Sequence, residues 1–461
     1  MTPGPMAPGS TTVSSTTVGS MTTRGSMTQA VRHDSMRARN LGVVLSEIRR
    51  SGPVTRAALA EITGLTKTTV SKMVGDLIAA GMVTETGTLR DGERGRPGTT
   101  LALSGERVAA LGLEINVDYL SVCVVDLTLA VRLRCAQAVD NRACTPAETL
   151  THLRKLIHKA VDEARAAGLT IAGSTLAVPG PVDGGLLHSA PNLGWRDVRV
   201  GDLMDGLTGE VGERPPGEFP GKFPVEVENE ANLAALGELW FGSAPDDFLH
   251  VSGEIGIGAG LVVGGTLFRG TRGLAGELGH VIVTPDGPAC RCGGRGCLEQ
   301  YAGQEALLRA AGLDLPASLP APGADLPGSG PGAGPGAGSG VPPALAELVR
   351  RLQEGDASAL RACERAGNAL GIALTSAINL LDPGTIVLGG VFAPLFPWIS
   401  GPARDTMAGR LGAMRRAVPE LAVSRLGADA ATLGAAGRVL QRVVADPGRH
   451  MATGRRDPGP R

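Results

Sequence analysis

A single segment of the chain combines one histidine with three cysteines. His280, Cys290, Cys292 and Cys297 follow the pattern H-x9-C-x-C-x4-C, with three glycines between the last two cysteines. One imidazole and three thiolates form a tetrahedral zinc set that leaves no position for water, so the ion would stabilise structure and would not activate a hydrolytic water. A redox pair and three unconnected thiols are the alternatives, but C-x-C is shorter than the usual C-x-x-C redox motif. We expect these four residues to bind a structural Zn²⁺.

Two glutamates flank this pattern. Glu277 comes three residues before His280, and Glu299 comes two residues after Cys297. Carboxylates held beside an imidazole suit a polyhydroxylated ligand, because each carboxylate oxygen accepts a hydrogen bond from a hydroxyl group. The alternative is that both glutamates are solvated surface residues.

A second polar group lies where a strand pattern runs into a helix pattern. Within "PVEVENEANLAALGELWFG" (224–242), Asn229, Glu230 and Asn232 occupy the junction. Because α/β folds place ligands at the carboxyl ends of strands, a binding role is favoured. An ordinary helix-capping cluster explains these residues equally well. Downstream, "GIGAG" (256–260) is compatible either with a phosphate loop or with a tight hairpin.

The elements that must position these residues alternate between strands and helices beyond residue 105. "VAALGLEINVDYLSVCVVDL" (108–127) predicts two strands with a tight connection, and "AETLTHLRKLIHKAVDEARAAG" (147–168) predicts an amphipathic helix. "TIAGSTLAVPGPVD" (170–183) reads as a buried strand that enters a Gly-Pro loop, and "AATLGAAGRVLQRVV" (430–444) as a closing helix. This alternation indicates an α/β domain.

The part before residue 105 has a different pattern of three short helices. "NLGVVLSEIRRSG" (40–52) has one apolar face, Thr55 is a plausible N-cap for "RAALAEITG" (56–64), and Thr66 caps "KTTVSKMVGDLIAAG" (67–81). A helix, a glycine turn and a second helix with polar donors at its exposed start suit reading of the DNA major groove. The exposed donors are Lys67, Thr68, Ser71 and Lys72.

A basic hairpin follows these helices. "MVTETGTLRDGERGRPGTTLALS" (82–104) predicts two short strands around a tip that carries Arg94 and Arg96, and such a wing can contact phosphates or the minor groove. Residues 36–104 contain ten Lys and Arg against six Asp and Glu, whereas the net charge of the whole chain is −1. This asymmetry suggests a polyanion partner for the head. The alternative is a generic three-helix interaction module.

Composition separates folded from unfolded segments. Many of the 68 glycines and 32 prolines gather near the N-terminus and in a Pro/Gly-rich stretch before residue 343, which have too few apolar side chains to offset chain entropy. The N-terminus has no apolar signal-peptide core, and nowhere do eighteen apolar residues run uninterrupted. We therefore expect a cytoplasmic protein, and a reducing compartment argues against a disulfide framework for the seven cysteines.

These observations divide the chain into domains. We expect a disordered N-terminal tail (1–35), a winged helix-turn-helix DNA-binding domain (36–104), and a large α/β domain (105–445). The α/β domain would contain the zinc segment (280–297) and a disordered insertion (312–343), and a disordered tail (446–461) would end the chain.

Several motifs together resemble the ROK family of repressors, open reading frames and kinases. They fall in the family's order over nearly the whole chain, and the combined H-x9-C-x-C-G-x2-G-C-L-E signature is highly specific. The motifs are "LAVPGPVD" (176–183), "APNLGW" (190–195), "VENEANLAALGE" (227–238), "GIGAGLVVGGTLFRGTRGLAGELGH" (256–280), "CRCGGRGCLE" (290–299) and "NLLDPGTIVLGG" (379–390).

This resemblance implies an actin-like (ribonuclease-H-like), two-lobed α/β domain of the sugar-kinase type, with a sugar in the cleft. It assigns contacts with sugar hydroxyls to Asn229, Glu277, His280 and Glu299, to which we add Glu230 as a further sugar-binding residue, and it assigns structural zinc to His280 and the three cysteines. The winged head is what the repressor branch adds, and the chain is most similar to the xylose-repressor group of that branch.

The chain departs from the family's kinases at the nucleotide site. Kinases open with D-x-G-G-T, where this chain has Glu114–Asp118, and Asp118 would place a negative charge near the ATP phosphates. The kinase base is the Asp of N-D-A-N, which Glu230 replaces. The longer side chain of Glu would move the carboxylate away from the position that in-line transfer requires. The second phosphate loop, G-T-G, becomes Glu254-Ile255-Gly256. We therefore expect no enzymatic activity.

The leading hypothesis is a sugar-responsive transcriptional repressor of carbohydrate-utilisation genes. Two heads of a homodimer would bind a roughly palindromic operator, and a small sugar in the cleft would close the lobes and release DNA. The alternative is an ATP-dependent sugar kinase that keeps a DNA-binding head. A third possibility is a DNA-binding protein that is controlled by a partner protein.

Overall fold

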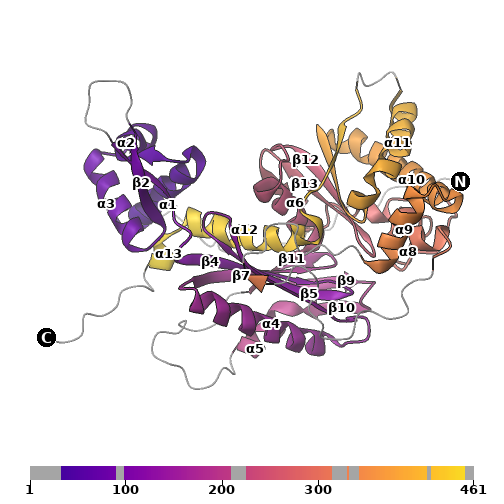
Figure 1. Cartoon of the computed structure of the whole chain (residues 1–461), viewed down its shortest axis with the longest axis horizontal. Coiled ribbons are helices and arrows are strands. Elements are labelled where there is room, and N and C mark those ends of the chain that lie inside the picture. The colour runs from indigo at the N-terminus through magenta and orange to yellow at the C-terminus, as the bar shows by residue number, and fades with distance from the viewer. Residues whose placement is uncertain are drawn as a thin grey trace, which may run out of the picture.

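The computed structural model of the chain describes residues 33–89, 98–208, 225–313, 330–331, 342–412 and 417–451. In these residues the chain forms a small N-terminal head and two larger lobes (Figure 1). Most of the predicted N-terminal tail and insertion, the wing-tip residues Arg94 and Arg96, and the last ten residues lie outside the described residues.

The head is a winged helix-turn-helix, as the sequence predicts. Thr55 and Thr66 are the N-caps of α2 and α3, since their side chains accept hydrogen bonds from the backbone amides of Ala58 and Thr69. Gly64 ends α2 at φ 68°, a left-handed conformation that glycine adopts without strain. The elements of the head are α1 (His33–Ser51), β1 (Val54–Thr55), α2 (Arg56–Thr63), α3 (Lys67–Ala79), β2 (Val83–Leu89) and β3 (Gly98–Leu103).

The first lobe is built on a six-stranded sheet with the strand order β11-β7-β4-β5-β6-β15. β4 pairs antiparallel with β5 and parallel with β7, and β7 pairs parallel with β11. The strands are β4 (Val108–Ile115), β5 (Tyr119–Asp126), β6 (Val131–Ala138), β7 (Thr170–Val178), β11 (Val225–Asn229) and β15 (Gly330–Pro331). β15 is one described part of the segment in which the sequence analysis placed the insertion.

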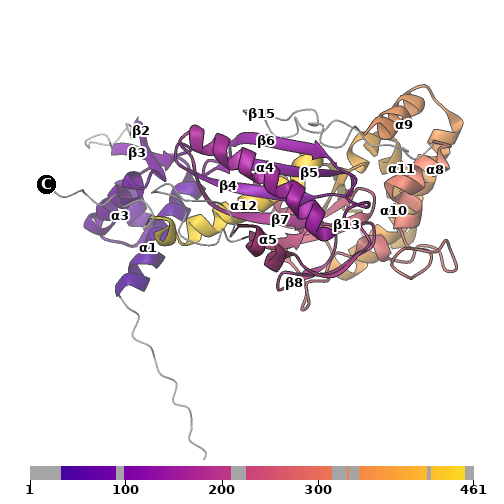
Figure 2. The same cartoon turned by 90° about the horizontal axis from the view of Figure 1, so that it is seen from below.

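Helices cover both faces of this sheet. α4 (Pro146–Ala166) begins with a capping box of Thr145 and Glu148, and its apolar side packs on the face formed by Leu111 and Leu113 of β4. α12 (Ala430–Ala445) packs on the opposite face, where Gly112 lets it approach β4 closely. Figure 2 shows α4 lying across the strands. The remaining elements of this lobe are β8 (Val182–Asp183), β9 (Leu186–Ala190), β10 (Trp195–Arg199) and α5 (Val200–Thr208).

The second lobe contains a five-stranded sheet with the strand order β14-β13-β12-β16-β17. α6 lies against β12 and β13, while α10 and α11 pack on each other and share a separate apolar core with the sheet. The strands are β12 (Phe248–Gly253), β13 (Ile257–Val263), β14 (Thr266–Phe268), β16 (Thr385–Gly390) and β17 (Glu420–Val423). The helices are α6 (Glu230–Phe241), η1 (Leu278–His280), α7 (Glu299–Ala302), α8 (Gln304–Ala310), α9 (Pro343–Gln353), α10 (Ala357–Leu381), α11 (Phe392–Leu411) and η3 (Gly427–Asp429).

α12 connects all three parts of the molecule. It packs along α6 and along the first sheet, and its last turn meets α1 of the head (Figure 1). A Cβ added to Gly42 of α1 would lie 2.2 Å from the carbonyl oxygen of Ala445, so only glycine permits this crossing. At the other end, Asp429 precedes the helix and pairs with the buried Arg134 of β6 at 2.8 Å. The head therefore shares one continuous apolar core with α12.

The end of the described chain also contacts the head. The sequence analysis assigned residues 446–461 to a disordered tail, but α13 (Gly448–Met451) is a short helix that lies next to α1. Similarly, α1 begins at His33, within the predicted N-terminal tail.

Candidate functional site

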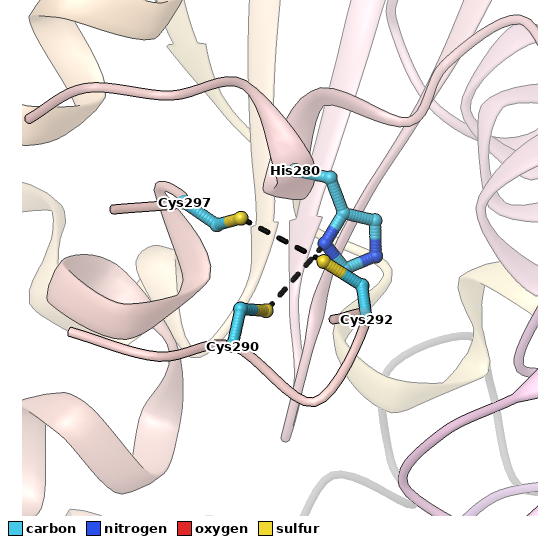
Figure 3. A group of neighbouring side chains, drawn as sticks. All are labelled: His280, Cys290, Cys292 and Cys297. Atoms are coloured by element: carbon cyan, nitrogen blue, oxygen red, sulfur yellow. Dashed lines mark hydrogen bonds between the residues drawn. The ribbon is translucent and has the colours of Figure 1, made fainter. Parts of the chain in front are cut away.

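The structure brings the four predicted metal-binding residues together, and we refer to them as the His–Cys cluster: His280, Cys290, Cys292 and Cys297. One donor atom from each residue lies within 4.8 Å of the others, and the four side chains point toward one another (Figure 3). The Sγ atoms of Cys292 and Cys297 are 3.8 Å apart, so the pair is not a disulfide. The cluster has the size and chemistry of a metal centre.

Local backbone contacts shape the loop that carries these donors. The amide of Cys290 donates to the carbonyl of Gly294, and the amide of Gly294 donates to the Sγ of Cys292 at 3.4 Å. Burial and the two neighbouring thiols raise the pKa of Cys297 to about 12. Three thiols this close therefore do not ionise together unless a cation compensates their charge, which is the role that a metal ion fills.

The imidazole of His280 connects the His–Cys cluster to the predicted sugar-binding residues. Its Nδ1 lies 3.8 Å from the Sγ of Cys290, and its Nε2 lies 3.8 Å from a carboxylate oxygen of Glu277. Burial raises the pKa of Glu277, and His280 partly offsets this effect. The Nδ1 atom is thus available to a metal, while the Nε2 atom faces a carboxylate acceptor.

Glu299 is held by the backbone of the second lobe. Its Oε2 accepts a hydrogen bond from the amide of Ile257 at 3.3 Å, and burial raises its pKa. A Cβ on Gly256 would lie 2.6 Å from this same oxygen. Gly256 therefore makes room for Glu299. It ends the short connection between β12 and β13, and the rest of "GIGAG" belongs to β13, which pairs antiparallel with β12.

Asn229 acts as a helix cap, the structural alternative that the sequence left open. Its side-chain oxygen accepts from the amide of Asn232, and its Nδ2 donates to the carbonyl of Gly180 at 3.0 Å. The cap fixes the start of α6 against the Gly-Pro loop that follows β7. This contact does not exclude a sugar contact, because an amide group has further hydrogen-bonding capacity.

Glu230 is the first residue of α6 and points into a small cavity between the lobes. The cavity has a volume of about 20 Å³ and is lined by Glu230, Glu114 and Glu254, together with small residues of α6, β12 and the start of α12. Burial, followed by the negative charges of Glu114, Glu254 and Glu277, raises the pKa of Glu230 well above its ordinary value. Glu230 is therefore close to the predicted sugar-binding residue Glu277 and also to the carboxylates of Glu114 and Glu254.

Glu114 and Glu254 are the departures that line this cavity. Glu114 is 3% exposed and accepts from the Tyr119 hydroxyl at 2.9 Å, and burial followed by repulsion from Glu254 raises its pKa to about 8. Burial and the charge of Asp118 raise the pKa of Glu254 to about 7. Asp118, which belongs to the same departure as Glu114, pairs with Arg142 at 2.9 Å.

Sequence reasoning gave no role to Asn192, which lies close to this site. A Cβ on Gly256 would lie 3.1 Å from its Nδ2, next to Glu299. Arg291, within the cysteine loop, donates to the Oδ1 of Asn192 at 2.8 Å and pairs with Glu305 at 3.0 Å. The loop of the His–Cys cluster thus also orients Asn192. The sequence feature that could have indicated a role for Asn192 is its place as a polar residue in "APNLGW", a motif that the sequence analysis used only for the family resemblance.

The predicted DNA-contacting residues of α3 lie together on one exposed face. The opposite face buries Val70, Val74 and Leu77 in the core of the head. The exposed residues are Lys67, Thr68, Ser71 and Lys72. Arg94 and Arg96 lie outside the described residues, so their DNA contacts stay a prediction.

Comparison with known proteins places this arrangement in a family. The sequence profile of the ROK family matches residues 110–442. The chain belongs to the ROK family. The profile of the MarR family matches residues 43–93, within the winged helix-turn-helix. The two matches confirm the fold class and the resemblance that the motifs indicated.

Individual relatives include both regulators and kinases. The xylose repressor of Bacillus subtilis (strain 168) is 29% identical over 408 residues, which are 88% of this chain and 96% of that protein. A solved ROK family transcriptional regulator, a homologue of the Mlc protein of Escherichia coli, has a TM-score of 0.66 at 24% identity, with 91% of this chain and 98% of that chain covered. A ROK family glucokinase from Streptomyces griseus, in complex with glucose and AMPPNP, has a TM-score of 0.54 at 25% identity, with 72% and 98% covered.

Among the residues that the structure describes, no helix is both long and apolar enough to cross a membrane. The cytoplasmic location stays a prediction from the sequence.

Proposed function

We propose that this chain is a sugar-responsive transcriptional repressor of carbohydrate-utilisation genes. The observation that carries the proposal is α12, which lines the cavity between the lobes at its start and packs against α1 of the winged head at its end. A ligand that changes the lobes at the first end therefore acts on a rigid element that reaches the DNA-binding head at the other.

In the proposed function, the heads of a homodimer bind a palindromic operator. α3 enters the major groove with Lys67, Thr68, Ser71 and Lys72 on its exposed face. A dimer suits this geometry because one short recognition helix reads only a few base pairs, and two related half-sites supply the rest. Arg94 and Arg96 of the wing add phosphate contacts.

The proposed sugar-binding residues are Asn229, Glu230, Glu277, His280 and Glu299. Their carboxylates accept hydrogen bonds from sugar hydroxyls, and the Nε2 of His280 faces the same side as Glu277. The raised pKa values of Glu277 and Glu299 reflect burial, which strengthens each hydrogen bond to a hydroxyl relative to one in water.

We assign Zn²⁺ to the His–Cys cluster in a structural role. The donor set of one imidazole and three thiolates fits this ion and fills its four positions. The bound ion would fix the loop that carries Cys290 and Arg291, and thereby hold Asn192 and His280 in place.

We further propose that the chain does not phosphorylate its sugar. Glu114 and Glu254 line the cavity in the region where the family's kinases hold nucleotide phosphates, and buried carboxylates repel phosphate. The alternative, a sugar kinase with a DNA-binding head, rests on Glu230 at the position of the kinase base. A coupled assay for ATP-dependent phosphorylation separates the two, because turnover of any sugar would support the kinase.

The experiment that tests the repressor uses DNA selected by the full-length protein from a random pool. The protein–DNA complex is titrated with a panel of pentoses, hexoses and amino sugars, and bound DNA is followed by fluorescence anisotropy. We expect at least one sugar to release the DNA. If no sugar releases the DNA although DNA binding is intact, this result would contradict the proposed sugar response and favour control by a partner protein.

A further inference from the structure

Two glutamates of the edge strand β11 lie on the face of the first sheet that α12 covers. Because successive side chains of a strand point to opposite faces, Glu226 and Glu228 share one face, and the valines of the strand pack on the apolar core beneath α4. Arg438 of α12 pairs with Glu226 at 2.7 Å, and Arg442, one helical turn later, pairs with the same carboxylate at 3.0 Å. These ion pairs hold α12 on the edge of the first sheet.

Glu228 differs from Glu226 because it also contacts the second lobe. Its Oε2 accepts a hydrogen bond from the Nε of Arg269 at 2.7 Å, and the Nη2 of the same arginine lies 2.6 Å away. Arg269 directly follows β14, so this ion pair crosses from the sheet of the first lobe to that of the second. Because the side chain of Glu228 is only 8% exposed, solvent screens this pair less than a pair on the surface.

Both members of this ion pair are attached to parts of the proposed sugar site. In the first lobe, the Oε1 of Glu228 accepts a hydrogen bond from the amide of Asn229 at 3.0 Å. In the second lobe, the backbone carbonyl of Arg269 accepts from the amide of Ala275 at 3.2 Å, which closes the loop that leads to Glu277. Since Asn229 and Glu277 are proposed sugar-binding residues, the ion pair fixes the two sides of the sugar site relative to each other.

The oxygen that binds Arg269 is also within reach of α12. The Nη1 of Arg438 lies 3.5 Å from the Oε2 of Glu228, which is longer than the 2.7 Å to Arg269. If Arg269 moves away with the second lobe, the buried carboxylate loses its nearest cation, and a buried charge without compensation is costly. Arg438 is the neighbouring cation that can take this place, so a movement of the lobes changes the contacts that hold α12.

We propose that Glu228 is a positioning residue that transmits the arrangement of the two lobes to α12, because it shares one carboxylate oxygen between Arg269 and Arg438. The inference rests on the proposed function, since it names the residue through which the sugar site regulates the head that α12 contacts. The ion pair with Arg269 joins the two sides of the sugar site, so it favours the arrangement that binds sugar.

The test measures sugar binding and DNA binding separately in the zinc-loaded, full-length protein. Isothermal titration calorimetry with D-xylose, D-glucose and N-acetyl-D-glucosamine gives the sugar affinity without DNA, and fluorescence anisotropy gives the DNA affinity and the release of DNA by each sugar. Glu228→Gln keeps the size of the side chain and an oxygen for the amide of Asn229, but it removes the charge. We expect it to bind sugar at least about fivefold more weakly and DNA more tightly.

Two further positions separate the contacts of this oxygen, and they keep the test valid if Glu228→Gln does not fold. Arg269→Gln should weaken sugar binding about as much as Glu228→Gln, whereas Arg269→Lys keeps a positive charge beside the carboxylate and should restore most of the affinity. Arg438→Gln removes the arginine that links Glu228 to α12. Its sugar affinity should stay within about twofold of that of the unchanged protein, while sugar no longer releases the DNA.

Glu347→Gln is the matched control, because Glu347 is a carboxylate that two arginines share within α9 of the second lobe. It should keep both the sugar affinity and the release of DNA. A purely structural role would lower the unfolding temperature of Glu228→Gln, measured by circular dichroism, and leave its sugar affinity and DNA release unchanged. That result would overturn the proposal, as would a loss of sugar affinity and DNA affinity together.

Failure of the proposed function is recognised in the unchanged protein. If none of the three sugars releases its DNA, the sugar response is contradicted, and measurements without sugar then decide on Glu228. Small-angle X-ray scattering should give a larger radius of gyration for Glu228→Gln than for the unchanged protein and Glu347→Gln, because the ion pair between the lobes is lost, and DNA binding should be tighter. The absence of either change would overturn the coupling.

Discussion

The His–Cys cluster and the carboxylate cavity both gather ionisable side chains, but the chain assembles them in different ways. The four donors of the cluster come from one segment of eighteen residues, 280–297, and lie within 4.8 Å of one another. The three carboxylates of the cavity come from three segments in two lobes and surround a space of about 20 Å³. The geometry of the cluster therefore depends on one local loop, whereas the geometry of the cavity depends on how the two lobes lie relative to each other.

The largest expected effect comes from breaking the cluster. Cys292→Ser removes one of four metal donors, and we expect the sugar response to disappear and stability to fall by several kcal/mol, because binding of a structural zinc is coupled to folding. Zinc content by atomic emission and thermal unfolding measure the change. Cys144→Ser is the control, since Cys144 stands outside the cluster. An unchanged sugar response in Cys292→Ser would remove the structural role assigned to the metal.

The second effect concerns the cavity and depends on pH. The folded state raises the pKa of Glu114 to about 8, so between about pH 4.5 and pH 8 the folded chain holds a proton that the unfolded chain releases. Stability should therefore fall as pH rises through this window, by up to a few kcal/mol. After burial, repulsion from Glu254 and Asp429 adds to the rise in this pKa, and the hydrogen bonds from Tyr119 and Asn116 oppose it.

Glu114→Gln should make the pH dependence flatter and leave the protein more stable than the unchanged chain at pH 9. Urea unfolding at a series of pH values measures this. Glu364→Gln, which removes an exposed carboxylate of α10, is the control and should keep the original pH dependence. A parallel pH profile in Glu114→Gln would show that this carboxyl titrates normally and that the cavity is not as costly as its burial indicates.

A third change leaves the His–Cys cluster and the carboxylate cavity intact and alters the contact between α12 and the head. Gly42→Ala places a methyl group 2.2 Å from the carbonyl oxygen of Ala445, which overpacks the crossing and costs about 1–3 kcal/mol. We expect DNA affinity to persist while the sugar needed for release rises, as measured by anisotropy. Gly409→Ala on α11 is the matched control, because nothing lies within 4 Å of the added Cβ. Equal sugar responses in the two variants would mean that the signal does not pass through α12.

The smallest effect is expected on the face of α3, far from both regions. Lys67→Ala and Lys72→Ala should each weaken DNA binding by about 1 kcal/mol and reduce the slope of log affinity against log salt by about 1, because each removes one phosphate contact. Lys155→Ala on α4 is the matched control for loss of an exposed lysine. A salt slope that stays the same in both α3 variants would move the DNA contacts to another face.

Local features of this molecule followed directly from the sequence. Thr55 and Thr66 were expected to cap helices, and both do, because a cap involves residues only three positions apart. His280 and the three cysteines converge as their spacing suggested. For Asn229, the sequence left capping and ligand binding equally open, and the structure places its oxygen on the amide of Asn232. The caps are fixed within one helical turn, and the four metal donors within one segment of the chain.

Long-range contacts could not be read from spacing. The approach of Arg291 to Asn192 joins residues 99 positions apart, and no periodicity marks it. The buried pair of Arg134 and Asp429 ties β6 to the start of α12, although either residue alone looks like a surface charge. These contacts depend on which face of each element meets its neighbour after the lobes have packed.

The sequence by itself determined the winged head, the α/β body and the donor set of the His–Cys cluster, because caps, hydrophobic periodicity and ligand spacing act over short stretches of chain. Only the tertiary structure decided that Glu114, Glu230 and Glu254 share one cavity and that α12 runs from this cavity to Gly42 of the head. The physical reason is that burial, repulsion between carboxylates and close helix crossing arise between segments that the fold, not their order along the chain, brings together.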